Sequence, residues 1–93
     1  MKVIELLSNV NVIKYACEQD MEITGVSYDS RKVEPGNVFV AVAGFRTDGH
    51  KYIAQAVEKG AALVVCETQP EISVPYALVG DSRLALAKIS DNF

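Results

Sequence analysis

Two continuous apolar runs with a helical pattern between them constrain the fold of this chain more than any other feature. They span residues 38–42 and 61–66, with the sequences Val-Phe-Val-Ala-Val and Ala-Ala-Leu-Val-Val-Cys. Such runs are typical of strands that are buried on both faces of a sheet. In the segment between them, apolar residues recur at helical spacing at Ile53, Ala56 and Val57. Strand, helix and strand within about 30 residues predict a βαβ unit, whose crossover should be right-handed.

The flanking sequence supplies the turn and capping signals that such a unit needs. Asp48 is well placed to cap the central helix, Gly60 to end it, and Pro35-Gly36 to form a turn before the first run. We therefore expect an α/β fold with a small sheet and helices packed on it, in a single domain that spans residues 1–93. The other expected elements are a helix at 3–7, an edge strand at 12–17, strands at 23–28 and 76–79, and a last helix capped by Asp81.

The last helix has an apolar stripe that continues to the end of the sequence. The stripe comprises Ala85, Leu86, Ile89 and Phe93, the final residue. An apolar residue at that position still needs a partner to pack against. We therefore expect these 93 residues to be a fragment of a longer protein.

Composition and charge argue against several classes of function. The formal net charge is −3 and the pI is near 5.0, which argues against nonspecific binding to nucleic acid. No apolar run reaches the roughly 18 residues of a membrane span, and the N-terminus lacks the apolar core of a signal peptide. We therefore expect a cytoplasmic protein without a membrane partner. Cys17 and Cys66 lie in unrelated contexts, and we expect both to be buried free thiols.

Polar turns follow two of the expected strands, at the edge where ligands bind in open α/β sheets. One turn is Tyr28-Asp29-Ser30-Arg31, and the other runs from Gly44 to His50. Hydroxyls, backbone N–H groups and a guanidinium at such an edge suit an anionic ligand that is rich in hydroxyl groups. Two structural alternatives stay open. Arg31 could pair with a nearby acidic residue, and the second loop could be a glycine-assisted turn capped by Asp48.

No catalytic constellation accompanies these turns, so the residues favour a binding domain. Residues 44–51 lack the Gly-Lys-Ser/Thr ending of an ATP-binding P-loop, because His50 occupies the lysine position. His50 is the only histidine, so neither a metal site nor a catalytic triad is expected. Glu67 and Glu71 should be solvated. Most aromatic residues are expected in the core, but Tyr28 and Phe45 adjoin the turns and could stack on a planar base.

Five short motifs occur in order along nearly the whole chain. They are Ile-Thr-Gly-Val-Ser-Tyr-Asp-Ser-Arg (23–31), Pro-Gly-Asn-Val-Phe-Val-Ala-Val-Ala-Gly (35–44), Asp-Gly-His-Lys-Tyr-Ile (48–53), Ala-x-x-x-Gly-Ala (56–61) and Asp-Ser-Arg-Leu-Ala-Leu-Ala (81–87). This series resembles the N-terminal domain of the Mur ligase family. The resemblance is greatest to the MurE type, the UDP-N-acetylmuramoyl-L-alanyl-D-glutamate ligases.

The resemblance implies that specific residues bind UDP. Enzymes of the family have a UDP-binding N-terminal domain, a central ATPase domain and a C-terminal amino-acid-binding domain, and this chain would end before the second. By position, the residues that hold UDP would be Tyr28, Ser30, Phe45, Arg46 and Thr47, with Asp29, Arg31, Asp48 and His50 in support. Some relatives carry a His-Gln-Ala type of loop where this chain has residues 45–47. We expect Arg46 to pair with the diphosphate instead.

The resemblance also implies the chemistry of the full-length parent. Such an enzyme uses ATP and Mg²⁺ to activate a carboxylate as an acyl phosphate, which the incoming amine attacks, and so adds the third residue of the peptidoglycan stem peptide in the bacterial cytoplasm. The fragment alone would hold no cofactor, metal or catalytic residue and would be inactive. Its partners would be the UDP-N-acetylmuramoyl-peptide substrate and the remaining domains. Two alternatives stay open: a MurF-type ligase that adds D-Ala-D-Ala, and a non-catalytic α/β protein-interaction module.

Overall fold

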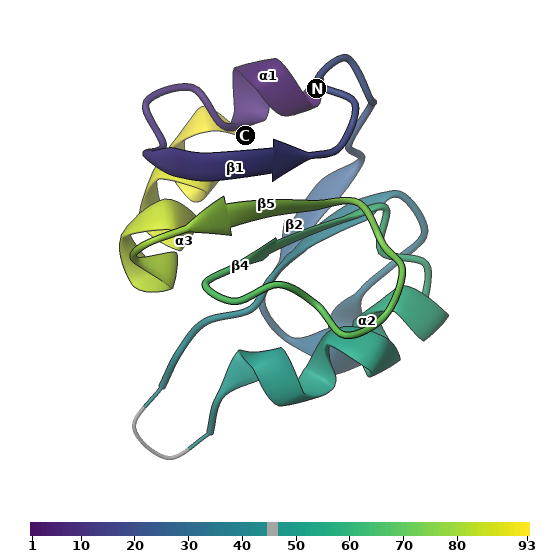
Figure 1. Cartoon of the computed structure of the whole chain (residues 1–93). Helices are drawn as coiled ribbons and strands as arrows, with labels where there is room; N and C mark the ends of the chain where they lie inside the picture. Colours follow the sequence, from purple (N-terminus) through teal and green to yellow (C-terminus); the bar gives the residue numbers. More distant parts are fainter. Residues whose placement is uncertain (45–46) are drawn as a thin grey trace.

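A five-stranded mixed sheet forms the centre of the chain in a computed structural model that describes residues 1–44 and 47–93 (Figure 1). The strand order is β1-β5-β4-β3-β2. Neighbours from β2 to β5 run parallel, and β1 pairs antiparallel with β5 at the edge of the sheet. The strands are β1 (Val12–Ala16), β2 (Gly25–Ser27), β3 (Asn37–Val40), β4 (Leu63–Cys66) and β5 (Tyr76–Val79).

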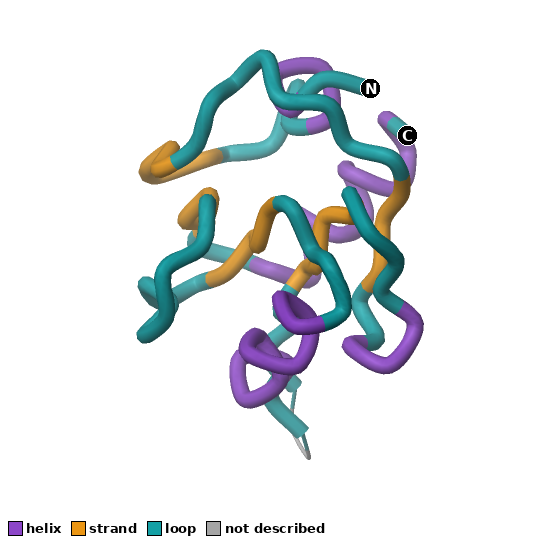
Figure 2. Tube along the Cα trace, turned by 90° about the vertical axis from the view of Figure 1, so that its right-hand side faces the viewer, coloured by secondary structure: helices purple, strands orange, loops and turns teal. Residues whose placement is uncertain are grey.

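Helices cover both faces of the sheet. The helix α2 (Ile53–Glu58) lies on one face, while α1 (Val3–Leu6) and α3 (Ser82–Asn92) lie together on the other, as the two perpendicular views show (Figures 1 and 2). Two 3₁₀ turns, η1 (Ser30–Lys32) and η2 (Gly49–Tyr52), follow the loops after β2 and β3. The two termini lie close together in both views.

The two central strands are buried on both faces, as their uninterrupted apolar sequences predict. All four residues of β3 and of β4 are buried. Side chains alternate across the sheet, so Val38 and Val40 pack with α1 and α3, whereas Phe39 packs with Ile53 and Ala56 of α2. The expected strand–helix–strand unit is confirmed, with β3 and β4 as parallel neighbours on either side of α2.

The predicted strand at 23–28 is shorter than expected, because its first residues pair elsewhere. Glu22 forms a β-bridge with Lys2, and the Ile23 N–H donates to the Met1 carbonyl at 2.8 Å. These residues are therefore held by the N-terminal segment and not by β3. Only Gly25–Ser27 continue in the sheet as β2.

The capping predictions are confirmed, although the helix after Asp48 begins with a 3₁₀ turn. The Asp48 side chain accepts a hydrogen bond from His50 N at the start of η2, and Asp81 accepts one from Leu84 N at the start of α3. Gly60 ends α2 with a φ of 108°, in the left-handed region that glycine adopts without a Cβ penalty.

The predicted apolar stripe of α3 does not reach the last residue. Ala85 and Ile89 are buried, but 54% of Phe93 is exposed. The last turn is fastened through polar contacts instead, because the Asn92 side chain donates to the carbonyls of Leu6 and Ser8. Phe93 therefore packs outside the core.

The cysteines are free thiols, and one of them is less buried than expected. Cys66 is buried, and burial raises its pKa to about 11. Cys17 is only half-buried, although desolvation and the neighbouring charge of Glu18 raise its pKa as well. Within residues 1–44 and 47–93, no helix is long and apolar enough to cross a membrane.

Candidate functional site

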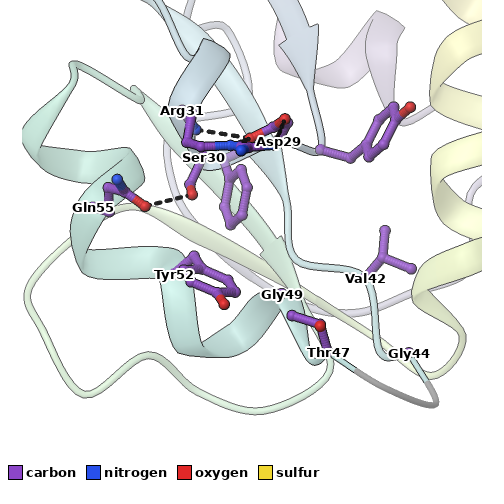
Figure 3. Close-up of a pocket in the computed structure, with 11 residues that line it drawn as sticks. Asp29, Ser30, Arg31, Val42, Gly44, Thr47, Gly49, Tyr52 and Gln55 are labelled. Atoms are coloured by element: carbon purple, nitrogen blue, oxygen red, sulfur yellow. Dashed lines mark hydrogen bonds and ion pairs between the residues drawn. The ribbon is translucent and has the colours of Figure 1, made fainter.

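A pocket of about 670 Å³ opens beyond the carboxyl ends of β2 and β3 (Figure 3). This is the edge at which the polar turns of the sequence predicted a ligand, since parallel strands place their carboxyl ends together. Besides Phe39 of β3, three segments contribute to it: the turn after β2, the loop after β3, and the segment formed by η2 and α2. The lining residues are Tyr28, Asp29, Ser30, Arg31, Phe39, Val42, Gly44, Thr47, Gly49, Tyr52 and Gln55.

The turn after β2 is fixed by its own side chains. Asp29 accepts a hydrogen bond from the Arg31 N–H at 3.0 Å and so caps η1. The Arg31 guanidinium donates to both carboxylate oxygens of Asp29, at 3.1 and 2.9 Å. These bonds lower the pKa of Asp29 to about 2. Of the two roles open for Arg31, pairing with an acidic neighbour is therefore the one found.

The wall formed by η2 and α2 brings polar and aromatic groups to the pocket. The Ser30 hydroxyl donates to the Gln55 side-chain oxygen at 2.7 Å and so joins the turn to α2. Because that oxygen accepts this bond, the N–H groups of the Gln55 amide are the part that can donate to a ligand. Tyr28 is 67% exposed and Tyr52 is 41% exposed, so two aromatic residues that line the pocket are not buried in the core.

The loop after β3 forms the third wall. Gly49 N–H donates to the Val42 carbonyl at 2.9 Å and closes the base of the loop. The approach is close, because a Cβ on Gly49 would lie 2.7 Å from the Val42 nitrogen. Gly44 and Thr47 line the pocket from this loop. The predicted ligand residues Phe45 and Arg46 lie outside the described part of the chain.

Asp48 and His50 do not line the pocket but hold the turn behind it. Nδ1 of His50 lies 2.6 Å from the Asp48 carboxylate, and the Glu67 N–H donates to Nε2 of His50 at 2.8 Å. The sequence predicted a solvated Glu67, but the residue is only half-exposed. One of its carboxylate oxygens accepts hydrogen bonds from Ser82 N and Oγ at 2.8 and 2.7 Å. The physical reason is that Ser82 begins α3, where a carboxylate satisfies an unpaired N–H. Glu71 is exposed, as expected.

Most of the predicted UDP-binding residues that the structure describes lie together. Tyr28, Ser30 and Thr47, with Asp29 and Arg31 in support, line the same pocket, whereas the supporting residues Asp48 and His50 lie behind it.

Two lining residues that carry hydrogen-bonding groups, Tyr52 and Gln55, were not predicted as site residues. Tyr52 is one of the aromatic residues that were expected in the core, and no role was predicted for Gln55. The sequence did contain one signal for them. Asp48 predicted the start of a turn, and that turn must begin beside the crevice at the end of β3, so the residues that follow Asp48 could have been expected near the ligand.

The described lining residues are suited to binding a ligand. The polar lining groups are a serine, a threonine, an amide and two exposed tyrosines, together with the ion pair of Asp29 and Arg31, whose opposite charges cancel. Among the described residues, no cluster of three or more potential metal ligands occurs. An aromatic border with hydroxyl and amide partners fits a planar ring that carries hydrogen-bonding groups.

Comparison with known proteins places this site in a family context. Residues 22–93 match the sequence profile described as the Mur ligase family, catalytic domain. A UDP-N-acetylmuramoyl-L-alanyl-D-glutamate–2,6-diaminopimelate ligase of Bacteroides fragilis is 47% identical over 96 residues, and one of Bacillus licheniformis is 43% identical over 94 residues. Both alignments cover all of this chain but only 20% and 19% of the relatives, so the chain spans about a fifth of their length.

Solved structures agree with this relationship. MurF from Acinetobacter baumannii aligns with 98% of this chain and 20% of its own, with a TM-score of 0.84 and 27% identity. MurF ligase from Thermotoga maritima, solved in complex with ADP, aligns with 78% of this chain and 17% of its own, with a TM-score of 0.66 and 36% identity. The family profile covers most of the sequence, and these structures share its fold. The chain therefore belongs to the Mur ligase family.

Proposed function

We propose that this chain binds the UDP part of UDP-N-acetylmuramoyl-L-alanyl-D-glutamate for a MurE-type ligase. The observation that carries the proposal is the pocket at the carboxyl ends of β2 and β3, whose lining combines exposed tyrosines with hydroxyl and amide groups. It occurs in a chain whose curated relatives at 47% and 43% identity are named as diaminopimelate-adding ligases of this substrate. Residues 1–93 would then form one UDP-binding domain of the longer enzyme.

The pocket residues divide by the part of UDP that each can contact. Tyr28 and Tyr52 offer aromatic faces for the uracil ring. Ser30, Gln55 and Thr47 supply hydroxyl and amide groups for the uracil edge and the ribose. Phe45 stays a predicted ligand residue, and Arg46 is proposed to pair with the diphosphate.

The charge of the pocket is compatible with a diphosphate. Asp29 would repel phosphate groups if it were unpaired, but its carboxylate binds the Arg31 guanidinium through two hydrogen bonds. The local charge of the turn is therefore close to neutral, and the repulsion of an anion is correspondingly small. Arg46 would then be the cationic side chain that distinguishes UDP from uridine.

The ligation itself belongs to the longer enzyme in this proposal. ATP and Mg²⁺ would activate the substrate carboxylate for attack by the incoming amine, in parts of the protein other than this domain. Among the described pocket residues there is no cysteine, histidine or unpaired carboxylate to act as a nucleophile or base. The domain contributes by binding and orienting the nucleotide end of the substrate, and alone it should have neither ATPase nor ligase activity. The names of the relatives favour diaminopimelate as the added residue.

A titration of ¹⁵N-labelled chain with UDP tests the proposal, with uridine and pyrophosphate titrated separately as controls. We expect saturable shifts confined to residues 28–31, 42–49 and 52–55, with a Kd on the order of millimolar, about −4 kcal/mol. Tyr28→Ala should weaken binding, whereas Tyr15→Ala, which removes an exposed tyrosine on β1, should not. Arg46→Ala should weaken UDP more than uridine.

Two outcomes would contradict the proposal. Equal shifts with UDP and pyrophosphate would show that no nucleoside is recognised. A lack of any shift, both here and in the longer natural protein, would favour a protein-interaction module.

A MurF-type ligase is the second candidate, because the solved neighbours with TM-scores of 0.84 and 0.66 are MurF proteins. The identities favour the MurE type, at 47% for the Bacteroides fragilis ligase against 27% and 36% for the two MurF structures. Both types would take a UDP-linked substrate, so the UDP titration does not separate them. An assay of the longer enzyme with diaminopimelate or D-Ala-D-Ala as the added amine does.

A further inference from the structure

We propose that Glu67, which does not line the pocket, is a positioning residue that fixes the pocket wall formed by Gly44, Thr47 and Gly49 after β3. The inference rests on the proposed function, because it assigns Glu67 a role in nucleotide binding. Glu67 directly follows β4 and reaches the loop by two separate routes. One uses its carboxylate and the other its backbone N–H.

The carboxylate route passes through the first residue of α3. One carboxylate oxygen of Glu67 accepts hydrogen bonds from Ser82 N at 2.8 Å and from Ser82 Oγ at 2.7 Å. Because the hydroxyl proton is directed to Glu67, the Ser82 oxygen is left to accept, and it accepts the Ala43 N–H at 2.9 Å. Ser82 is fully buried, so water does not substitute readily for either partner. Ala43 directly precedes Gly44 of the pocket wall.

The backbone route passes through His50. The Glu67 N–H can only donate, so Nε2 of His50 must be the acceptor at 2.8 Å. The ring proton is therefore on Nδ1, where it faces the Asp48 carboxylate at 2.6 Å. His50 directly follows Gly49, which also lines the pocket. The two routes thus hold the chain just before and just after the wall residues Gly44, Thr47 and Gly49.

The bonds of Ser82 exceed what a helix start requires. Asp81 already caps α3 by accepting the Leu84 N–H at 3.0 Å. Ser82 nevertheless binds Ala43, and the Arg83 side chain donates to the Ala43 carbonyl at 3.2 Å. The N–H and the carbonyl group of Ala43 therefore both form hydrogen bonds with side chains of α3. A helix cap alone would not account for this convergence on one residue of the loop.

The test compares Glu67→Ala with Glu67→Gln in the 93-residue chain. The glutamine keeps an oxygen that can accept both Ser82 bonds, so it should behave like the parent. Glu67→Ala should lower the hydrogen-exchange protection of the Ala43 amide about tenfold, the scale of one lost hydrogen bond, shift the amides of Gly44, Thr47 and Gly49, and raise the Kd for UDP several-fold. Glu71→Ala, an exposed carboxylate nearby, is the matched control and should change none of these.

The readouts separate this inference from the proposed function. If the parent chain does not bind UDP, the proposed function fails, while exchange at Ala43 still tests whether Glu67 holds the loop. If Glu67→Ala does not fold, Ser82→Ala replaces it, since it removes the same link to Ala43 and should give the same loss of protection. Unchanged protection and unchanged amide shifts in the alanine variant, or an equal loss of UDP affinity in the glutamine variant, would overturn the proposal.

Discussion

Gly49→Ala is the substitution that most directly tests the geometry of the pocket. The Cβ that alanine adds would lie 2.7 Å from the Val42 nitrogen and 3.1 Å from its oxygen. Both atoms belong to the backbone, so no side-chain rotation relieves the contact. Gly49 and Val42, which lies two residues beyond β3, must therefore move apart, by about 0.7 Å for the Cβ to reach an ordinary separation of 3.4 Å from that nitrogen.

The expected cost follows from this displacement. The Gly49 N–H donates to the Val42 carbonyl at 2.9 Å, and a shift of that size along the bond would leave about 3.6 Å, beyond hydrogen-bonding distance. The lost bond costs about 1 kcal/mol and the remaining crowding about 1–2 kcal/mol. Reduced entropy of the unfolded chain offsets about 0.5–1 kcal/mol. The free energy of unfolding should fall by about 1.5 kcal/mol, and Tm by about 10 °C in a chain of this size.

The assay is urea unfolding followed by circular dichroism, with Gly80→Ala as the matched control. A Cβ on Gly80 would meet Ile13 Cδ1 at 3.8 Å, an ordinary contact, so its unfolding free energy should stay within about 0.5 kcal/mol of the parent. The Gly49 variant should also bind UDP more weakly, because its wall has moved. Equal unfolding free energies for the two variants would refute the reasoning about the close approach.

Two further predictions concern titration and reactivity. The Asp29 carboxyl, with its pKa of about 2, should contribute to stability fully above its ordinary pKa of 3.8 and lose this contribution as the pH falls through about 2. Arg31→Ala should move that pKa upward in a ¹³C carboxyl titration, and an unmoved value would contradict the ion pair. Burial holds the pKa of Cys66 at about 11, so a thiol reagent at pH 8 should modify Cys17 alone in the native chain and both thiols in urea. Rapid modification of two thiols without denaturant would count against the buried position of Cys66.

The central strands and the caps were predictable because each is encoded by a few neighbouring residues. The uninterrupted run at 61–66 contains β4, since such a run is typical of a strand that is buried on both faces. Asp48 and Asp81 start their turns as expected, because a cap needs only the next three residues.

The parts of the site that depend on distant contacts were not predictable. Glu67 looks solvated in the sequence, because its partner Ser82 lies on the far side of a loop and of β5. The position of Gln55 at the pocket involves a hydrogen bond from Ser30, a residue of another segment. Helical spacing reports which face of α2 is apolar but not what stands opposite its polar face.

The position of β1 beside β5 sets the order in which the chain can fold during synthesis. Val12 pairs with Val79, so β1 leaves the ribosome long before its neighbour in the sheet exists. Until residues 76–79 have been made, β1 has no neighbouring strand to pair with, although α1 can already pack on β3 and β4. The last strand is therefore the one that closes the sheet, and a nascent chain halted before Tyr76 should remain accessible to chaperones and proteases along residues 12–16.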